Sequence, residues 1–296
     1  MIITDFTKNT GHTLLLGDND PKPVEIINNP GNIILTGPHN GNAVPSCLPE
    51  CMGTNPEWFF NAHEAMDLHM DKLFRTLQEG FKQVSFISGN YSRLVCDLNA
   101  MPDYAFTKHS PENNTIKIHH NEPDQCCSQQ RLQRLDTLYW PYHDAKQALI
   151  DQKRQEYGGV IVLDMHSFTP TWEQKKRDVE LGTIRSEKTP FSKILEAYLK
   201  EQSDYLFISG EPYRVAERPS NAAPMITEKS DLQYLGLEIR NDLLETDEGI
   251  SKMHNFLQKT LYYLLEHPDI DQAMKKRNDV IQPQKEDQDI YASWSI

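Results

Sequence analysis

Three reactive side chains stand at the ends of short apolar runs. His39 follows NIILTGP, His166 follows GVIVLDM, and Glu238 lies near the end of LGLEI. Short apolar runs bounded by turn residues are typical of buried strands, and open α/β sheets bind ligands beyond the carboxyl ends of their strands. Two imidazoles and a carboxylate at such an edge could form a catalytic zinc site, which has three protein ligands and one position for water.

Each of these side chains also has a structural explanation. A single histidine after a strand is more often a hydrogen-bonded loop residue than a metal ligand. Glu238 stands two residues before Arg240, so both side chains point to one face of a strand and are able to form an ion pair. The spacing leaves these alternatives open, because strand order cannot be read from one sequence.

A third ligand is expected between residues 62 and 69, in a stretch from Trp58 to Gln78 with helical spacing. His63 and Asp67 are four residues apart, so on a helix they share a face and could reach one metal ion. Glu64 is the other acid of this segment. The segment is not the H-E-x-x-H zinc motif, because position 67 holds aspartate. A solvated polar helix face is the alternative.

Polar residues also interrupt an apolar run at residues 92–99, SRLVCDLN. A guanidinium group binds a carboxylate through two parallel hydrogen bonds, which makes Arg93 a candidate for substrate binding. Asp97 is expected to orient Arg93 or to form a structural bridge with it, because buried charges are normally paired.

Other chemistries have little support. The chain contains no G-x-S-x-G elbow, P-loop or G-x-G-x-x-G, and Ser167 is too close to His166 for a catalytic triad. Forty-three acidic and 30 basic residues give a net charge of −13, which repels phosphate backbones, so no nucleic acid partner is expected. No apolar run approaches the roughly 20 residues of a membrane span. The first residues do not resemble a secretory signal, so we expect a cytoplasmic protein.

The remaining pattern predicts the frame that positions these residues. Strands alternating with helices indicate an α/β fold, with a mostly parallel, twisted sheet covered by helices on both faces. The expected strands cover residues 32–36, 84–87, 159–164, 179–184, 205–208 and 235–239, and the expected helices lie at 58–78, 129–156, 190–202 and 249–266. One domain is expected over residues 1–281, with 101–128 as a lid or binding loop and 282–296 as a C-terminal tail.

Seven segments together resemble the N-formylglutamate amidohydrolase family. They occur in order and nearly span the chain: PHNGNAVP at 38–45, HEAMD at 63–67, SRLVCDLN at 92–99, YWPYHDA at 139–145, DMHSFTPT at 164–171, GEPY at 210–213 and LEIRNDLL at 237–244. Each segment is short, but seven in order are specific. The form with HSFTP, EPY and EIRNDL is similar to a branch known mainly as predicted members.

The resemblance implies a fold and a metal site. The family is similar in fold to zinc carboxypeptidases and aspartoacylases, so a phosphorylase/hydrolase-like, zinc exopeptidase-like fold is expected. It implies metal at His39 and His166, with Asp67 as the acidic ligand. It also implies that Glu238 occupies the place of the carboxypeptidase general base, with His63 as a supporting residue.

The resemblance also implies substrate contacts. Arg93 and Asn99 match substrate-anchoring positions, and His143 falls on a Tyr-x-x-His-type position with a role in substrate contact or helix packing. Arg240 is a further candidate for the substrate carboxylate. One departure stands out, because the family usually reads Asn-Arg-Pro where this chain has Asn99 followed by Ala100, Met and Pro. If the missing arginine grips the glutamate side chain, N-formylglutamate itself is not the expected substrate.

These observations predict a hydrolase with one divalent metal ion, expected to be Zn²⁺. It would cleave the amide bond of an N-acyl (formyl-type) amino acid or a related small carboxylate, with no nucleic acid or membrane partner. A carboxypeptidase-like zinc exopeptidase is the alternative among hydrolases. A catalytically silent protein of the same fold that binds a small carboxylate is the alternative outside enzymes, although intact His39, His166 and Glu238 argue against it.

Overall fold

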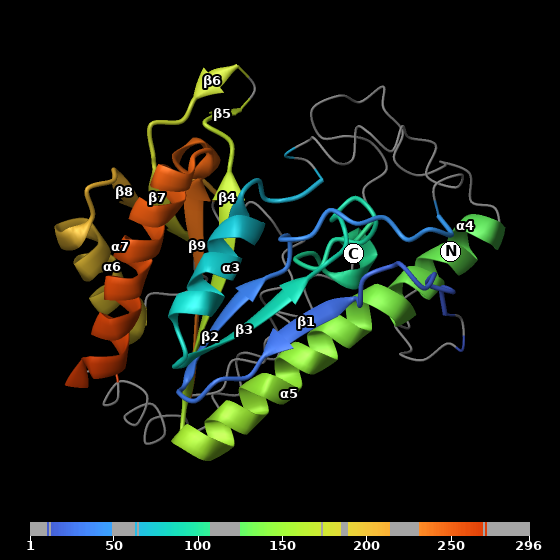
Figure 1. Ribbon diagram of the computed structural model, residues 1–296, viewed down its shortest axis with the longest axis horizontal. Coiled ribbons are helices and arrows are strands. Elements are labelled where there is room, and N and C mark those ends of the chain that lie inside the picture. The colour runs from blue at the N-terminus through green and yellow to red at the C-terminus, as the bar shows by residue number, and fades with distance from the viewer. Residues whose placement is uncertain are drawn as a thin grey trace, which may run out of the picture.

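A seven-stranded sheet forms the centre of the molecule (Figure 1). The computed structural model describes residues 11, 13–48, 63, 65–106, 125–172, 174–184, 189–213, 231–268 and 270. Within them the strand order is β1-β3-β2-β4-β9-β7-β8. The strands are β1 (Val24–Ile27), β2 (Ile33–Gly37), β3 (Val84–Gly89), β4 (Val160–Phe168), β7 (Leu181–Ile184), β8 (Phe207–Ser209) and β9 (Leu232–Arg240).

The four central strands β3, β2, β4 and β9 run parallel, so their carboxyl ends meet at one edge of the sheet. β1 joins one side antiparallel to β3, and on the other side β7 is antiparallel to β9 while β8 is parallel to β7. The predicted α/β fold with a mostly parallel sheet is confirmed. A short hairpin of β5 (Thr171–Trp172) and β6 (Lys175–Lys176) extends beyond the carboxyl end of β4 (Figure 1).

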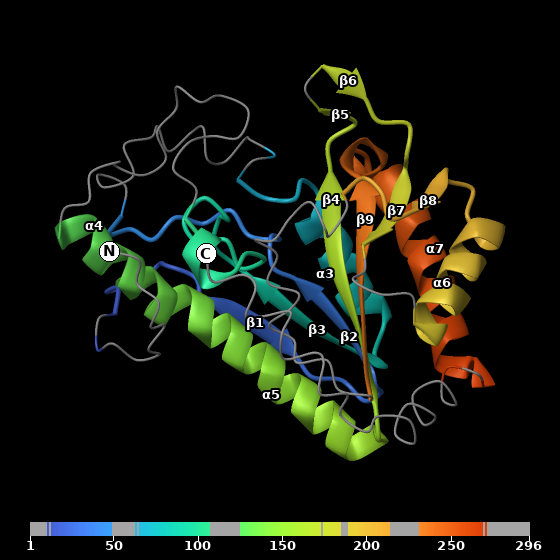
Figure 2. The same ribbon diagram turned by 180° about the vertical axis from the view of Figure 1, so that it is seen from behind.

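Helices cover both faces of the sheet. The helices α3 (Met70–Gly80), α6 (Pro190–Gln202) and α7 (Asp247–Glu266) share one hydrophobic core with the sheet. On the other face the chain is helical from α4 (Gln125–Arg134) through a π-helical turn (Leu135–Tyr139) to α5 (Trp140–Tyr157). Figure 2 shows α5 on one side of the molecule and α6 and α7 on the other. Short 3₁₀ turns occupy Pro102–Tyr104 and Asn241–Leu244.

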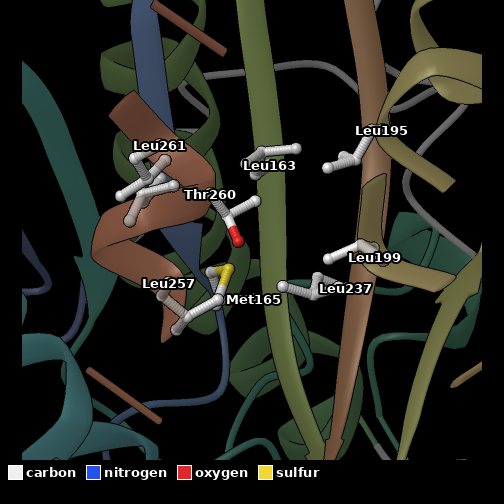
Figure 3. Close-up of a pocket in the computed structure, with 9 residues that line it drawn as sticks. Leu163, Met165, Leu195, Leu199, Leu237, Leu257, Thr260 and Leu261 are labelled. Atoms are coloured by element: carbon white, nitrogen blue, oxygen red, sulfur yellow. The ribbon is translucent and has the colours of Figure 1, made fainter. Parts of the chain in front are cut away.

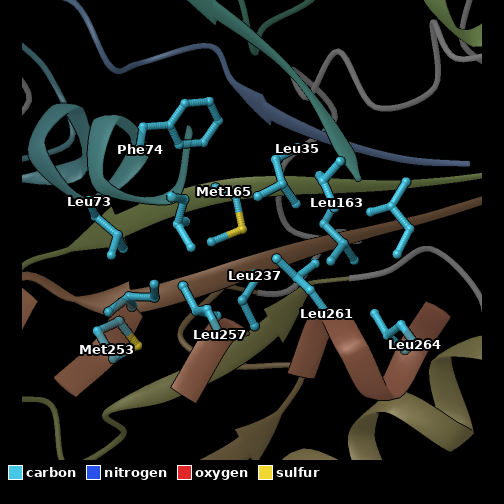
Figure 4. Close-up of a cluster of buried hydrophobic side chains, with 14 of the residues drawn as sticks. Leu35, Leu73, Phe74, Leu163, Met165, Leu237, Met253, Leu257, Leu261 and Leu264 are labelled. Carbon is cyan, nitrogen blue, oxygen red and sulfur yellow. The ribbon is translucent and has the colours of Figure 1, made fainter. Parts of the chain in front are cut away.

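The two faces of the central strands follow the alternation of a β-strand. Odd-numbered residues such as Leu163, Met165 and Leu237 pack against Leu257 and Leu261 of α7, as Figure 4 shows. Each such leucine contributes about 1.5–3 kcal/mol when fully buried. The even-numbered residues of β4 and β9 therefore face α5, and this assigns the reactive side chains to that face.

A cavity of about 10 Å³ remains in the core between the sheet, α6 and α7 (Figure 3). Its lining is apolar apart from Thr260, whose hydroxyl donates to the Phe256 carbonyl at 2.9 Å. A space of about the size of one water without polar partners stays dry, so we regard the cavity as a packing defect and not as a ligand site.

One predicted helix begins later than expected. In the described part of the stretch 58–78, residues 63 and 65–78, the helix begins at Met70 and residues 65–69 form turns. His69 precedes the helix with a φ of 66°, a left-handed conformation that cannot continue a right-handed helix. The prediction that His63 and Asp67 share a helix face was therefore wrong.

Other predictions were close or lie outside the described residues. The helices expected at 129–156, 190–202 and 249–266 are confirmed within a few residues, and β4 continues four residues past the predicted end at Asp164. Most of the expected lid, from 107 to 124, and the tail 282–296 lie outside the described residues. None of the described helices is long and apolar enough to cross a membrane.

Candidate metal and substrate site

The strand register sets His166 next to Glu238. Their Cα atoms are partners on the adjacent parallel strands β4 and β9, so both side chains project from the same face. β2, on the other side of β4, ends at Gly37, two residues before His39. All three side chains are buried. The structure thus brings His39, His166 and Glu238 to one edge of the sheet, as the sequence predicted.

Asp67 reaches the two histidines from the turns before α3. Its backbone N–H donates to the His39 carbonyl at 2.9 Å, which ties the two loops together. Asp67 Oδ2 lies 2.8 Å from His166 Nδ1, and Oδ1 lies 3.7 Å from His39 Nδ1. The Ser167 N–H also donates to Oδ2, at 3.2 Å. Donor atoms of the two histidines and the aspartate lie within 4.8 Å of one another, a spacing at which they could hold one metal ion.

A second pair of carboxylates holds the outer ring nitrogens. His39 Nε2 lies 2.7 Å from Asp97 Oδ1, and His166 Nε2 lies 3.3 Å from Asp164 Oδ2. Histidines that bind metal through one nitrogen almost always give the other to a carboxylate, a carbonyl or water. Both Nδ1 atoms therefore face Asp67, and His39 Nδ1 is buried without a hydrogen bond in the described part of the chain. This donor set fits a divalent metal ion.

Asp164 is itself fixed by two hydroxyl groups. Thr36 Oγ1 donates to Oδ1, and the Tyr234 hydroxyl donates to Oδ2 at 2.5 Å. Asn99 approaches the same ring nitrogen of His166 as Asp164 does, with Nδ2 at 3.2 Å from Nε2. Its backbone N–H donates to Asp97 Oδ1 at 2.8 Å. Asn99, expected to contact substrate, thus stands directly at the candidate site.

Charge balance in the site favours charged forms of the buried groups. Burial raises the pKa of Asp67, but the Arg93 charge and the two histidines outweigh it and hold that pKa well below its usual range. Burial lowers the pKa of His166, but Asp164 and Asp67 outweigh it and raise that pKa well above its ordinary value. Burial and Arg93 lower the pKa of His39, and Asp97 and Asp67 raise it more. Without metal, both imidazoles are thus stabilised as cations.

Arg93 makes a different ion pair from the predicted one. Its Nη2 donates to Asp67 Oδ1 and, at 3.0 Å, to the His63 carbonyl, while Asp97 pairs with His39. The predicted contact between Arg93 and Asp97 was wrong. The cause is local, because the Arg93 N–H donates to the Ala65 carbonyl at 3.1 Å and draws the arginine to the loop that carries Asp67. Arg93 Nε is buried and makes no hydrogen bond within the described residues.

Two other candidates have packing partners. Arg240 does not pair with Glu238, because its guanidinium binds Asp242 at 2.8 Å, Glu180 at 3.1 Å and three carbonyls of residues 177–179. His143 lies on α5 between rings, with centroids 4.3 Å from Tyr139 and 5.4 Å from Tyr142. Glu64 lies outside the described residues.

Sequence reasoning overlooked Asp164 and the role of Asp97. Asp164 stands two residues before His166 in a strand, so the two side chains share a face, and this signal was available in the sequence. The contact between Asp97 and His39 spans 58 positions and depends on the turns between residues 90 and 100, so no local pattern predicts it.

Comparison with known proteins gives a family and a fold. Residues 31–245 match the family described as N-formylglutamate amidohydrolase, a range that contains His39, Asp67, His166 and Glu238. A crystallised gene product from Agrobacterium tumefaciens is similar with a TM-score of 0.73 and 23% identity, over 85% of this chain and 99% of that one. The crystal structure of N-formylglutamate amidohydrolase from Ralstonia eutropha JMP134 is similar with a TM-score of 0.58 and 16% identity, over 88% and 98% of the two chains. No curated protein sequence matches this chain.

Proposed function

The chain belongs to the N-formylglutamate amidohydrolase family, and from that premise we propose that it is a metal-dependent hydrolase of small N-acyl amino acids. One observation carries the metal dependence. The Nδ1 atoms of His39 and His166 both face Asp67, while their Nε2 atoms are held by Asp97 and Asp164. Two imidazoles and one carboxylate match the ligand set of catalytic zinc sites, so Zn²⁺ is the proposed ion.

His39, Asp67 and His166 would hold the ion. When bound, it would polarise the scissile carbonyl and lower the pKa of water toward neutrality. Asp97 and Asp164 fix the rotation of the two rings, and the hydroxyl groups of Thr36 and Tyr234 fix Asp164 in turn. Such supporting contacts make a site rigid before substrate arrives.

Glu238 is the proposed general base and acid. It stands opposite His166 on the neighbouring strand, about 4.8 Å away at the backbone. It is buried and is not one of the three clustered donors, which favours a role in proton transfer over a role as metal ligand. Glu238 accepts the proton of the attacking water and passes it to the leaving amine nitrogen, while the bond between the carbonyl carbon and that nitrogen breaks.

Arg93 and Asn99 are the proposed polar contacts to the substrate amide. Arg93 lies beside Asp67 with a quarter of its side chain exposed, so it is proposed to stabilise the negative charge that develops on the carbonyl oxygen. The Asn99 amide lies beside His166 and is positioned by Asp97. The contacts of Arg240 and His143 favour structural roles for these two residues over substrate binding.

The substrate is proposed to differ from N-formylglutamate in its side chain. Ala100 occupies the position at which the resemblance leads one to expect an arginine, and its methyl group brings no charge. The Ala100 carbonyl accepts from the Tyr139 hydroxyl at 2.8 Å, so the backbone there is fixed in the core. We therefore propose an N-acyl amino acid whose only carboxylate is the α-carboxylate.

A hydrolysis screen tests this function. Purified protein is loaded in turn with zinc, manganese and cobalt and incubated with N-formyl and N-acetyl amino acids, and release of the free amine is measured. Release from N-formyl amino acids with neutral side chains, abolished by a chelator and restored by metal, is expected. Release only from peptides with a free carboxyl terminus would identify an exopeptidase instead. Stoichiometric metal without any turnover would identify a binding protein.

A further inference from the structure

Arg177 is held among three aromatic rings just beyond the carboxyl end of β4. Its guanidinium carbon lies 5.6 Å from the ring centroid of Phe168, 5.3 Å from that of Trp172 and 5.1 Å from that of Tyr213. These rings come from the end of β4, from β5 and from the segment after β8. Cation–π contact holds a guanidinium group in place without using its N–H donors. The side chain is only half-buried, so its donors can meet a ligand.

Most of the donors of Arg177 are available. Nη1 donates to the Thr169 carbonyl and to the Tyr213 hydroxyl, both at 3.3 Å. Within the described residues Nε and Nη2 have no hydrogen-bond partner. These two nitrogens lie on one edge of the guanidinium plane, the arrangement that binds the two oxygens of a carboxylate.

The aromatic cage borders the candidate active site. Phe168 stands two residues after His166 on the same face of β4, roughly 7 Å farther along the strand. On the other side, Gly182 is the register partner of Glu238. A Cβ on Gly182 would lie 1.9 Å from the Glu211 carbonyl, so the segment that carries Tyr213 packs directly against the strand beside Glu238. The cage therefore lies next to the strands that carry His166 and Glu238.

Among the described residues, Arg93 and Arg240 also lie near the site, and both are already paired. Nη2 of Arg93 is bound by Asp67, and the guanidinium of Arg240 is surrounded by Asp242, Glu180 and backbone carbonyls. Ala100 supplies no charge. In a chain of net charge −13, an anionic substrate needs a local cation. We propose that Arg177 binds the α-carboxylate of the substrate through Nε and Nη2, an inference that rests on the proposed function.

The position of Arg177 is also fixed through its backbone. Its N–H donates to the Pro170 carbonyl at 2.8 Å, and its carbonyl accepts from Arg240 Nη1 at 3.2 Å. Arg240 thus acts through Arg177 as a positioning residue, and it does not itself touch the substrate.

Paired substrates test this proposal. The zinc-loaded wild type and the Arg177→Met and Arg177→Lys variants are assayed on the best N-formyl amino acid of the screen and on its carboxamide, which lacks the charged group. Methionine keeps an apolar chain among the rings but has no N–H donors. Arg177→Met should lower kcat/KM for the acid by roughly 10- to 100-fold, mainly through KM, and leave the amide almost unchanged. Arg177→Lys should retain part of the activity on the acid. Equal losses on acid and amide would overturn the proposal.

A control variant on the same hairpin tests whether the loss of any nearby positive charge has the same effect as the loss of Arg177. Lys175 and Lys176 are exposed, and Lys176 has Thr171 as its strand partner and not the cage residue Trp172, so Lys176→Met removes one positive charge from this hairpin. It should not change the preference for the acid, and a loss as selective as that of Arg177→Met would overturn the proposal. Melting temperatures show whether the variants are folded.

A second measurement does not depend on turnover. If the wild type hydrolyses neither substrate, the proposed function fails. Binding of the same N-formyl amino acid, measured by calorimetry, then tests whether Arg177 contacts the carboxylate. Binding that is lost in Arg177→Met and kept in Lys176→Met supports the carboxylate contact. Binding of equal strength in both variants overturns it.

Discussion

His39 Nε2 lies 2.7 Å from Asp97 Oδ1, and this contact turns the other ring nitrogen toward Asp67. His166 has the same arrangement, with Asp164 behind Nε2 and Asp67 in front of Nδ1. Two histidines, one from the turn after β2 and one from β4, thus present the same atom to one carboxylate. A histidine with a purely structural hydrogen bond does not require that a second histidine present the same nitrogen to the same carboxylate. The shared arrangement therefore favours a metal site over two structural histidines.

The first prediction concerns the metal ligands. His39→Ala and His166→Ala should each lose bound zinc, because either change removes one of only three protein donors. Elemental analysis of purified protein provides the measurement. His69→Asn is the matched control, since His69 lies two residues from Asp67 but outside the cluster, and asparagine tolerates its left-handed backbone. Stoichiometric zinc in either alanine variant would rule out the assignment.

The second prediction concerns the carboxylates behind the histidines. Asp97→Asn and Asp164→Asn keep the shape but remove the negative charge that holds each imidazole. Zinc affinity should fall by roughly 10- to 100-fold, and excess zinc should restore much of the activity. Competition with a chelating dye measures the affinity. Asp178→Asn changes an exposed side chain in the same way and should have no effect. Unchanged affinity in both Asp97→Asn and Asp164→Asn would leave these aspartates as fold-stabilising residues only.

The third prediction separates metal binding from proton transfer. Glu238→Gln keeps the size of the side chain but removes the base, so kcat should fall by roughly 10²-fold or more while zinc stays bound. The exposed Glu201→Gln on α6 is the control for loss of one negative charge. If zinc is lost with Glu238→Gln, Glu238 is a ligand. Normal turnover would exclude it from the chemistry.

Sequence patterns predicted the strands of this site better than its loops. The apolar runs before His39, His166 and Glu238 are buried strands because few alternatives exist for a short apolar segment between turns. Their adjacency in the sheet was not predictable, since the order β2-β4-β9 depends on contacts between distant segments. The segment around Asp67 has helical spacing, yet the left-handed residue His69 ends that periodicity. No propensity identifies such a conformation in advance.

Partner choice among charged residues was the least predictable part. Arg93 and Asp97 lie four residues apart in the chain, and a bridge between them is the simplest expectation. A backbone hydrogen bond from Arg93 to Ala65 instead draws the guanidinium to Asp67 and leaves Asp97 to His39. Contacts between distant segments determine that Arg93 pairs with Asp67 and Asp97 with His39, and such contacts cannot be predicted from a single sequence.

The fourth prediction concerns protons. The pKa values of His39 and His166 are raised in the metal-free protein, because their aspartate partners outweigh burial. Below these raised pKa values the imidazoles carry protons that a metal ion must displace. Zinc binding at neutral pH should therefore release up to two protons, one from each histidine, and the apparent affinity should rise with pH. Calorimetry in two buffers of different ionisation enthalpy counts the protons. A count of zero at a pH below the ordinary imidazole pKa would contradict the raised pKa of both rings.

The last prediction concerns Arg93, whose role differs from that of Arg177. Arg93 pairs with Asp67 beside the candidate metal centre and a quarter of its side chain is exposed, so it is placed to stabilise charge on the scissile carbonyl. Lysine keeps the positive charge but loses the planar donor geometry. Arg93→Lys should therefore lower kcat/KM for an N-formyl amino acid and for its carboxamide by similar factors, because both contain the same carbonyl group. Kinetics of wild type and variant on the two compounds provide the comparison.

The opposite pattern would reverse the assignment. A selective loss on the acid in Arg93→Lys, with equal losses in Arg177→Met, would make Arg93 the anchor of the carboxylate. Zinc content must be measured for each variant, since Arg93 also contacts a proposed ligand, Asp67. Lower kcat/KM with full zinc occupancy places the effect in the reaction, whereas a loss in proportion to missing zinc makes Arg93 a support of the metal site. The roles proposed for the two arginines therefore predict different results: equal losses on acid and amide for Arg93→Lys, and a loss mainly on the acid for Arg177→Met. One set of assays distinguishes them.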